Sequence, residues 1–296
     1  MNFSLPQNPI FIVGSPRSGT TLLQSLMATQ PGIYSFPETH YFSVIEKQAA
    51  PEPDNELVTE DRLGCALETI EKKLELTFSN NEIAQLEELA RQERLTSKTL
   101  FESIVIHHLA GQNVDFEAQP PFLWVEKTPT HCNFIPRIVA LYPAARVLHI
   151  VRHPVPAIFS RKQLFPFNRQ TPLKELAHGW RRMQENVERV KKKIPKAIYS
   201  VRYEDLVAQL EETMLKVGLF LGIEFDLQRL RDFHRQETAF SLESEPWKGN
   251  SRNGEISNTN NRYKSIVNAH EAELIETIVS EQMTQFGYHT FLKNND

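Results

Sequence analysis

Cysteine is scarce in this sequence, and long hydrophobic runs are missing from it. Cys65 and Cys132 are the only cysteines among 296 residues, so we expect neither a disulfide framework nor a cysteine-based zinc site, and a reducing compartment fits best. No segment reaches the roughly 20 apolar residues that cross a bilayer, and residues 1–8 lack the basic and apolar segments of a signal peptide. We therefore expect a cytoplasmic protein without a membrane partner.

An excess of positive charge is also missing. The 33 Lys and Arg residues are outnumbered by 37 Asp and Glu residues, which gives a formal net charge of -4 at pH 7. Such a chain has no overall basic field to hold nucleic acid, so anions must be bound by local clusters of Arg and Lys. With 40% hydrophobic and 24% charged residues, the composition excludes a mostly disordered chain and predicts a globular protein without a nucleic-acid partner.

Short apolar runs rich in β-branched residues alternate with helical patterns along most of the chain. We expect strands at residues 9–13, 33–36, 122–126, 146–151 and 197–202. We expect helices at residues 20–29, 133–141, 155–164, 175–193, 206–221 and 271–286. This alternation predicts an α/β fold in which helices cover both faces of a parallel sheet.

One long segment departs from this alternation. The residues from about 51 to 113 are rich in Glu, Lys, Leu and Gln. Helical periodicity recurs within this segment at residues 62–76, 81–92 and 99–109. We interpret the segment as a helical insertion into the α/β fold rather than as an independent domain.

A glycine-bearing loop, residues 14–21, follows the first expected strand. Gly14 and Gly19 permit a tight turn whose backbone N–H groups point inward. Together with the N-terminus of the next helix, such a loop forms a cradle for phosphate. The spacing matches the ATP and GTP phosphate loop, but Thr20 occupies the position of its lysine, which contacts the β and γ phosphates. The loop therefore predicts an anion site with Arg17 as its cation, rather than a site of triphosphate hydrolysis.

The same loop carries a family resemblance. It resembles the 5'-phosphosulfate-binding loop of sulfotransferases that use the donor PAPS (3'-phosphoadenosine 5'-phosphosulfate), above all that of bacterial members and of the tyrosylprotein sulfotransferases. The resemblance rests on the consecutive residues Pro16, Arg17, Ser18, Gly19, Thr20 and Thr21. It implies a three-layer fold of the P-loop nucleoside-triphosphate-hydrolase type, a single sulfotransferase domain over residues 1–296, PAPS as donor and adenosine 3',5'-bisphosphate (PAP) as product.

A second anion site is indicated where the strand expected at residues 146–151 ends. Arg152 follows this strand and Ser160 comes eight residues later, and this pair resembles the 3'-phosphate-binding motif of the family. Arginine offers a forked, permanently charged donor that suits phosphate. Because PAPS has both a 5'-phosphosulfate and a 3'-phosphate, a requirement for two anion sites separates it from ATP. Residues 201–206 also resemble a recurrent family segment, which implies that Tyr203 contacts the nucleotide.

The transfer step needs a base for the acceptor hydroxyl and cations for the leaving phosphate, by analogy with phosphoryl transfer. Residues 36–39 resemble the Pro-Glu-Thr segment of tyrosylprotein sulfotransferases, which implies that Glu38 is the general base. His40 is the alternative base, since other branches use His and its ordinary pKa suits the task. Lys127 resembles the lysine that holds the bridging oxygen and the sulfonate, and Arg17 would share the neutralisation of the leaving group. This scheme requires no metal ion.

The sequence leaves the contacts of the C-terminal loop and the identity of the acceptor open. Residues 247–254 loosely resemble the family loop that closes over the 3'-phosphate, and Arg252, Ser257 and Arg262 are its candidate contacts. The hydroxyl-bearing acceptor is a carbohydrate, a protein tyrosine or a small metabolite, and the oligomeric state is undetermined. Two alternatives remain, a P-loop kinase or nucleoside triphosphatase and a non-catalytic nucleotide-binding protein of the same fold.

Overall fold

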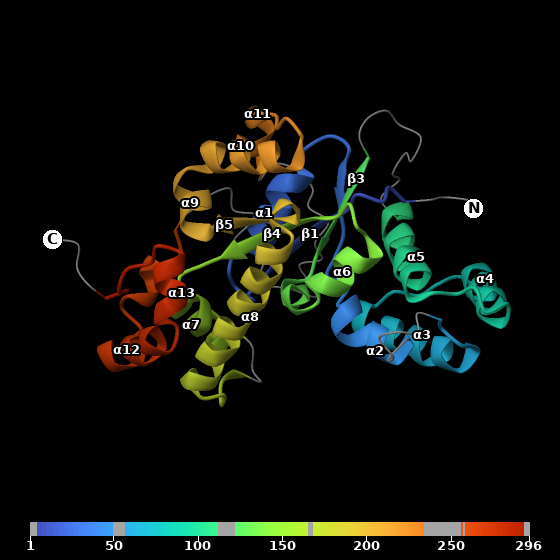
Figure 1. The fold of residues 1–296 in the computed structure, drawn as a ribbon, viewed down its shortest axis with the longest axis horizontal. Coiled ribbons are helices and arrows are strands. Elements are labelled where there is room, and N and C mark those ends of the chain that lie inside the picture. The colour runs from blue at the N-terminus through green and yellow to red at the C-terminus, as the bar shows by residue number, and fades with distance from the viewer. Residues whose placement is uncertain are drawn as a thin grey trace.

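The computed structural model describes residues 5–49, 57–111, 122–164, 168–233, 256 and 258–292. Its centre is a parallel five-stranded sheet in the order β2-β3-β1-β4-β5 (Figure 1). The strands are β1 (Ile10–Gly14), β2 (Ile33–Ser35), β3 (Leu123–Lys127), β4 (Arg146–Val151) and β5 (Ile198–Arg202). These strands confirm the five that the sequence predicts, and the helices around them confirm the predicted fold class.

Helices surround this sheet on both faces and at both ends. Those interspersed with or following the strands are α1 (Thr20–Ala28), α6 (Ile135–Leu141), α7 (Pro154–Leu164), α8 (Leu173–Lys193), α9 (Tyr203–Ala208), α10 (Leu210–Leu221), α11 (Leu227–Arg231), α12 (Ala269–Ile278) and α13 (Ser280–Gln285). Between β2 and β3 the chain forms the π-helical turn η1 (Tyr41–Ile45) and the helices α2 (Glu46–Ala49), α3 (Glu60–Leu74), α4 (Asn80–Arg91) and α5 (Ser97–Ala110), which gather at one end of the molecule in Figure 1. Within the described ranges, no helix combines the length and the apolar character that would let it span a bilayer.

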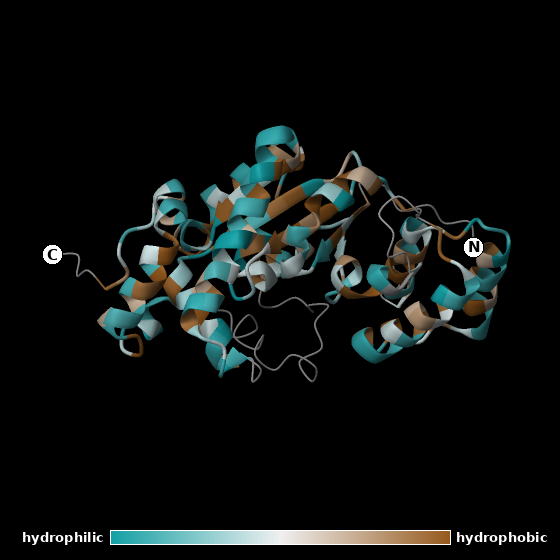
Figure 2. Cartoon of the chain, turned by 60° about the horizontal axis from the view of Figure 1, so that its bottom comes forward, coloured by the Kyte–Doolittle hydropathy of each residue, from teal (hydrophilic) through white to brown (hydrophobic). Residues whose placement is uncertain are grey.

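Strand β1 lies at the centre of the sheet. All of its residues are buried, and the register pairs Ile12 with Lys127 of β3 and with Leu148 of β4. A continuous apolar run of this kind is typical of a parallel strand that helices cover on both faces. One face of the sheet packs against α1, α10 and α11, and the other packs against α5, α6 and α8. In Figure 2 the strands form a brown, hydrophobic centre, whereas much of the outer helix surface is teal.

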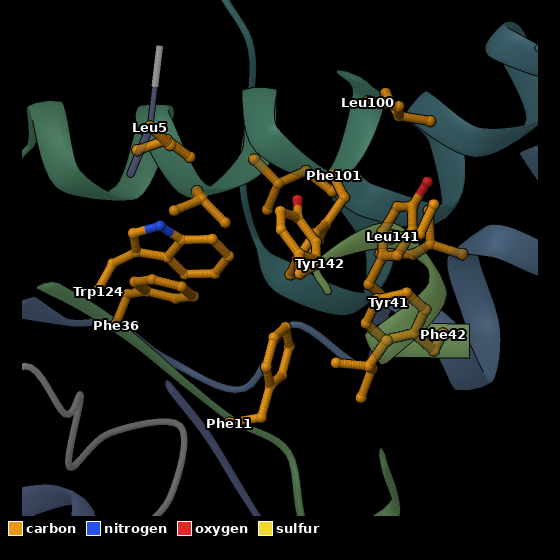
Figure 3. Close-up of a cluster of buried hydrophobic side chains, with 14 of the residues drawn as sticks. Leu5, Phe11, Phe36, Tyr41, Phe42, Leu100, Phe101, Trp124, Leu141 and Tyr142 are labelled. Carbon is orange, nitrogen blue, oxygen red and sulfur yellow. The ribbon is translucent and has the colours of Figure 1, made fainter. Parts of the chain in front are cut away.

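Aromatic side chains join the helices between β2 and β3 to the sheet (Figure 3). The ring of Phe11 on β1 lies 5.9 Å from the ring of Trp124 on β3 and 6.4 Å from that of Phe101 on α5. Phe101 also packs 4.8 Å from Tyr41 in η1. Aromatic pairs at these separations stabilise a core beyond the area that they bury. The helices expected as an insertion therefore share a core with the sheet.

Two helices predicted from the sequence are each divided in the structure. The segment 206–221 contains the end of α9 and all of α10, because Gln209 leaves the helical conformation with φ -138° and ψ 58°. The segment 271–286 divides at Val279, where φ is -114° and ψ is 17°, into α12 and α13. The apolar periodicity continues across both breaks, so it gives no sign of them. The pattern also fails to predict η1, α2 and α11, which are too short to show a period.

Candidate active site

The loops that follow the strands meet at one edge of the sheet. In a parallel sheet the carboxyl ends of the strands point to the same edge, and ligands bind in the crevice there. This edge carries the phosphate loop after β1, residues 36–40 after β2, Lys127 at the end of β3 and Arg152 after β4. Tyr203, the first residue of α9, follows β5. The topology thus gathers the residues that the sequence analysis singled out.

The phosphate loop is a tight turn that leads into an uncapped helix. A Cβ atom added to Gly14 would lie 2.4 Å from the carbonyl oxygen of Ile150, so only glycine fits against β4 here. Arg17 (φ 73°) and Gly19 (φ 96°) have left-handed backbone conformations, which non-glycine residues rarely adopt. Among the described residues no side chain caps α1, whose N-cap is Gly19, and the buried hydroxyl of Ser18 has no hydrogen-bond partner there either. The loop therefore offers donors to an anion.

Arg17 connects the phosphate loop with the second predicted anion site. Its Nε donates a hydrogen bond to the Ser160 hydroxyl at 3.2 Å. Nη1 of Arg152 donates to the carbonyl oxygen of Arg17 at 3.0 Å. Ser160 and Arg152 are both buried. The two anion sites that the sequence predicts separately are therefore adjacent, with side chains in direct contact.

Arg152 is held by residues from distant parts of the chain. Its Nε donates to Oδ1 of Asn260 at 2.7 Å, and its Nη2 donates to the Thr259 hydroxyl at 3.0 Å. The guanidinium lies over the ring of Tyr203, 4.6 Å from the ring centroid, which is a cation–π arrangement. No sequence pattern marks Thr259 or Asn260, because short uncharged side chains in a polar loop form no recognisable motif.

Glu204 anchors the C-terminal segment to this edge of the sheet. Its Oε1 accepts hydrogen bonds from the backbone N–H of His153 at 3.0 Å and from Nδ2 of Asn260 at 2.8 Å. Its Oε2 accepts from the hydroxyl of Tyr288 at 2.9 Å. The carboxylate thereby joins the end of β4, the start of α9 and the C-terminal segment, and it fixes Asn260 where that residue meets Arg152.

Three arginines gather at this edge, and we call Arg17, Arg152 and Arg262 the arginine cluster. Burial and the nearby charges of Arg152 and Arg262 lower the pKa of Arg17. Burial is also the largest cause that lowers the pKa of Arg152, and Arg262 acts in the same direction. Arg262 is exposed, and its Nη2 donates to the hydroxyl of Tyr263 at 2.6 Å. The other candidates of the C-terminal loop lie outside the described residues: Arg252, Ser257 and the segment 247–254.

Glu38, Lys127 and His40 lie together near the arginine cluster. Lys127 is fully buried, and its Nζ donates a hydrogen bond to Oε1 of Glu38. Nε2 of His40 lies 3.5 Å from Oε2 of Glu38. Burial lowers the pKa of His40, although Glu38 opposes the shift, so the imidazole is neutral at pH 7 and can accept a proton. The charge of Glu38 also raises the pKa of Arg17, which places this carboxylate close to the phosphate loop.

Sequence reasoning missed a buried polar cluster behind Glu38. Glu126 precedes Lys127 on β3 and is fully buried, as are its neighbours Thr39, Thr128 and His131. A carboxylate directly after an apolar run within a buried strand is a signal that the sequence does contain, because a buried charge must be paired. As for metals, the described part of the chain holds no group of three or more His, Cys, Asp or Glu side chains that could bind an ion.

Comparison with known protein families gives a match over most of the chain. A family model described as "Sulfotransferase family" matches residues 9–227. The omega-hydroxy-beta-dihydromenaquinone-9 sulfotransferases Stf3 of Mycobacterium bovis and Mycobacterium tuberculosis are each 28% identical to this chain over 268 residues. The alignment covers 76% of this chain and 66% of each relative, so the chain spans just under two thirds of the length of these relatives.

Solved structures of sulfotransferases have the same fold as this chain. The sulfotransferase domain from the curacin biosynthetic pathway has a TM-score of 0.64 and 21% identity, over 97% of this chain and 99% of that chain. The sulfotransferase domain of the Synechococcus PCC 7002 olefin synthase has a TM-score of 0.56 and 20% identity, over 98% of each chain. A mouse sulfotransferase in complex with PAP has a TM-score of 0.53 and 13% identity, over 95% of this chain and 85% of that chain. At these identities the likeness establishes the fold.

Proposed function

The chain belongs to the sulfotransferase family, and on that premise we propose that it transfers a sulfonate group from PAPS to an acceptor hydroxyl. In this reaction the acceptor oxygen forms a bond to sulfur while the bond between sulfur and the 5'-phosphate oxygen breaks. That phosphate oxygen leaves with the electron pair, which yields PAP, and the hydroxyl proton passes to a base. The protein must therefore bind a bisphosphorylated nucleotide, hold a base and supply cations to the leaving group.

The observation that carries the proposal is the arginine cluster beside an uncapped helix N-terminus. Arg17, Arg152 and Arg262 repel one another, and burial raises the free energy of the charged forms of Arg17 and Arg152. The N-terminus of α1 adds partial positive charge and unpaired N–H groups. A ligand with two anionic groups lowers the repulsion among the arginines and accepts hydrogen bonds from the unpaired N–H groups. PAPS carries such groups at the 5' and 3' positions of one ribose, which suits two adjacent sites.

We assign the 5'-phosphosulfate to the phosphate loop. The residues that form this cradle are Pro16, Arg17, Ser18, Gly19, Thr20 and Thr21. Arg17 neutralises the anion, and the Ser18 hydroxyl, which has no partner among the described residues, is a spare donor for an oxygen of the ligand. The left-handed conformations of Arg17 and Gly19 turn the backbone into the cradle. Their uncommon geometry at the entrance to α1 supports a functional role for the loop.

We assign the 3'-phosphate to Arg152 and Ser160. A guanidinium has five N–H groups, and within the described part of the chain Arg152 uses one each for Asn260, Arg17 and Thr259, which leaves two for phosphate. The Ser160 hydroxyl accepts a hydrogen bond from Arg17 and keeps its own proton to donate. Tyr203 contacts the nucleotide in this assignment. Its ring lies against the guanidinium of Arg152, which supports a place beside the same ligand.

Glu38, Lys127 and Arg17 carry the transfer step in this proposal. Glu38 takes the proton from the acceptor hydroxyl, Lys127 stabilises the bridging oxygen and the sulfonate, and Arg17 shares the charge of the leaving phosphate. The hydrogen bond from Lys127 to Glu38 supports a place for both at the reacting centre. His40 is the alternative base, because its neutral imidazole lies beside Glu38. Since Arg17 and Lys127 supply the cations, the proposed reaction uses no metal ion.

The wider setting of the reaction is part of the same proposal. We propose that the described helices of the predicted insertion act with the sheet as one domain, which their shared aromatic core supports. We also propose a cytoplasmic location, which two free cysteines support. The acceptor is a hydroxyl-bearing compound. Since two relatives are named as sulfotransferases of a hydroxylated menaquinone, a prenylated quinone alcohol joins carbohydrates, tyrosine peptides and small metabolites as a candidate.

Transfer of labelled sulfonate from PAPS to these four acceptor classes tests the proposed function. We expect one class to accept the label and PAP to accumulate in equal amount. Calorimetric titration with PAP, and with ATP and Mg²⁺ as the comparison, tests the donor site separately. Tighter binding of ATP with Mg²⁺ than of PAP would favour a kinase or triphosphatase, and PAP binding without transfer to any class would favour a non-catalytic nucleotide-binding protein.

A further inference from the structure

We propose that Glu126 is a positioning residue for sulfonate transfer, which clamps the loop of residues 36–40 across the end of β3 and so holds Glu38 against Lys127. Glu126 acts through Thr39, Thr128 and His131, and we call these four residues the carboxylate clamp. The inference rests on the proposed function of Glu38 and Lys127 and adds the residues that set their geometry.

The loop straddles the end of β3. Successive residues of a strand point to opposite faces, and the core clusters show that Trp124 faces one side and Val125 the other. Glu126 therefore lies on the Trp124 side and Lys127 on the Val125 side. Two consecutive loop residues bind these two strand residues, one on each face. Glu38 accepts a hydrogen bond from Lys127, and the Thr39 hydroxyl donates to Oε1 of Glu126 at 2.8 Å. A loop held on both faces of a strand cannot slide by one residue without losing both contacts.

Among the described residues, the Glu126 carboxylate is hydrogen-bonded by hydroxyl and amide donors and by the imidazole of His131, and it is held as an anion. The Thr128 hydroxyl donates to Oε1 at 2.6 Å, and Nδ1 of His131 lies 2.9 Å from Oε2. Burial alone would favour the neutral acid, but the charge and hydrogen bond of His131 and the two threonine hydroxyls outweigh it and lower the pKa of Glu126. A charge-assisted cluster of this kind is stronger than neutral hydrogen bonds.

The carboxylate clamp also accepts hydrogen bonds from the backbone of the loop. The N–H of Thr39 donates to Oε1 of Glu126 at 3.4 Å, the N–H of His40 donates to the Thr128 hydroxyl at 3.2 Å, and the N–H of Tyr41 donates to the Thr39 hydroxyl at 3.3 Å. Three successive amides after Glu38 are thus hydrogen-bonded to the clamp. Their hydrogen exchange reports directly on whether the clamp is closed.

All members of the clamp are fully buried. Glu126, Thr39, Thr128 and His131 each expose 0% of their surface, and the ring of His131 packs against Phe42 with 5.0 Å between centroids. Both oxygens of the Glu126 carboxylate are engaged by members of the clamp, so in this proposal its effect on catalysis is through position. Because a misplacement of about 1 Å can lower a rate roughly 100-fold, loss of the clamp is expected to affect the transfer rate more than nucleotide binding.

A pair of substitutions at Thr39 tests the proposal. Thr39→Val removes the hydroxyl and keeps the side-chain shape, whereas Thr39→Ser keeps the hydroxyl. We expect Thr39→Val to lower kcat by about 10-fold or more, to leave the Kd for PAP within about 2-fold, and to raise the exchange rates of the amides of residues 39–41. We expect Thr39→Ser to resemble the wild type in all three measurements. Tyr142→Phe removes another buried hydroxyl outside the clamp and is the control for general destabilisation.

Each outcome decides between the clamp and its alternatives. Unchanged amide exchange in Thr39→Val, or raised exchange with unchanged kcat, would overturn the inference. An equal loss of kcat in Thr39→Val and Tyr142→Phe would also overturn it, because the effect would then be general destabilisation. If the wild type transfers no sulfonate to any acceptor class, the proposed function fails and takes the catalytic role of the clamp with it. In that case the exchange rates still decide whether the clamp holds the loop.

Discussion

The arginine cluster and the carboxylate clamp lie at the same edge of the sheet, but they differ in charge balance and in closure. The cluster brings three cations together, with Glu38 and Glu204 as nearby carboxylates. The clamp pairs one carboxylate with one imidazole and two hydroxyls, and all of its members are buried. Unbalanced charge that remains within reach of a ligand favours binding, whereas a buried carboxylate whose oxygens are hydrogen-bonded by neighbouring side chains favours a fixed geometry.

This difference predicts that the two regions affect different measurements, the affinity for the donor and the rate of transfer. A ligand that binds only the folded protein stabilises it more, the tighter it binds, and the repulsion within the arginine cluster is lowered when an anion enters. The clamp has no comparable repulsion, since its carboxylate is hydrogen-bonded by the other members of the clamp. We therefore expect changes in the arginine cluster to raise the Kd for PAP, with a fall in kcat as well at Arg17, and changes at Glu38 or in the clamp to appear mainly in kcat.

The largest effect is expected from Glu38→Gln, which keeps the shape of the side chain and its contact with Lys127 but cannot take a proton. Loss of a general base lowers a rate by about 10²–10⁴-fold, so we expect kcat to fall by about this factor. Removing a negative charge near Arg17 lowers repulsion of the donor, so the Kd for PAP should stay the same or decrease. Steady-state transfer and calorimetric titration with PAP measure the two effects.

His40→Gln is the matched comparison for this prediction. If Glu38 is the base, His40→Gln keeps most of the activity, because its ring then only neighbours the reacting carboxylate. A full loss of transfer in His40→Gln together with near-normal transfer in Glu38→Gln would instead assign the proton to His40. A large rise in the Kd for PAP in Glu38→Gln would contradict the separation of affinity from rate.

The arginine cluster is the part of the site that the sequence predicts well. Arg17 and Arg152 each stand just after an apolar run that becomes a strand, and a parallel sheet brings such positions to one edge. Their motifs are short and local, so each is recognisable without knowledge of the fold. The sequence does not reveal that Arg17 reaches Ser160, because that contact joins residues 143 positions apart. Side-chain direction across such a separation depends on how α7 packs.

The carboxylate clamp is the part that the sequence does not predict. Thr39 lies 87 residues from Glu126, and threonine is too common to draw attention on its own. The fold shows the same limit. Apolar runs predict the five strands, but the breaks at Gln209 and Val279 depend on local backbone conformation and not on the apolar period. Patterns with a period are visible in a sequence, whereas contacts made once between distant residues are not.

A second, smaller effect is expected within the arginine cluster. Hydrogen bonds to charged groups contribute about 1.5–3 kcal/mol, so Arg17→Ala should raise the Kd for PAP by roughly 10- to 100-fold. Ser160→Ala removes a neutral donor and should raise it by roughly 2- to 10-fold. Arg231→Ala, which replaces an exposed arginine on α11 that pairs with Glu211, is the control and should leave the Kd unchanged. An unchanged Kd in Arg17→Ala would remove the arginine cluster from the donor site.

The smallest effect is expected from Glu126→Gln and concerns stability as a function of pH. The folded state lowers the pKa of Glu126 below its ordinary value of 4.5, so the unfolded chain binds its proton more readily. The stabilisation is therefore complete well above pH 4.5 and is lost as the pH falls through the folded-state pKa. The loss amounts to about 1.4 kcal/mol for each pH unit between the pKa of the unfolded chain and that of the folded protein. Urea unfolding at pH 7 and at steps below pH 5 should show the wild type losing its advantage over Glu126→Gln in that window.

The binding of the donor is the internal control for this last comparison. The Kd for PAP at pH 7 should be the same for the wild type and Glu126→Gln, because the clamp does not touch the donor. A difference in stability that stays constant below pH 4.5 would mean that Glu126 is not held as an anion, and the clamp would then lose the charge on which its strength depends.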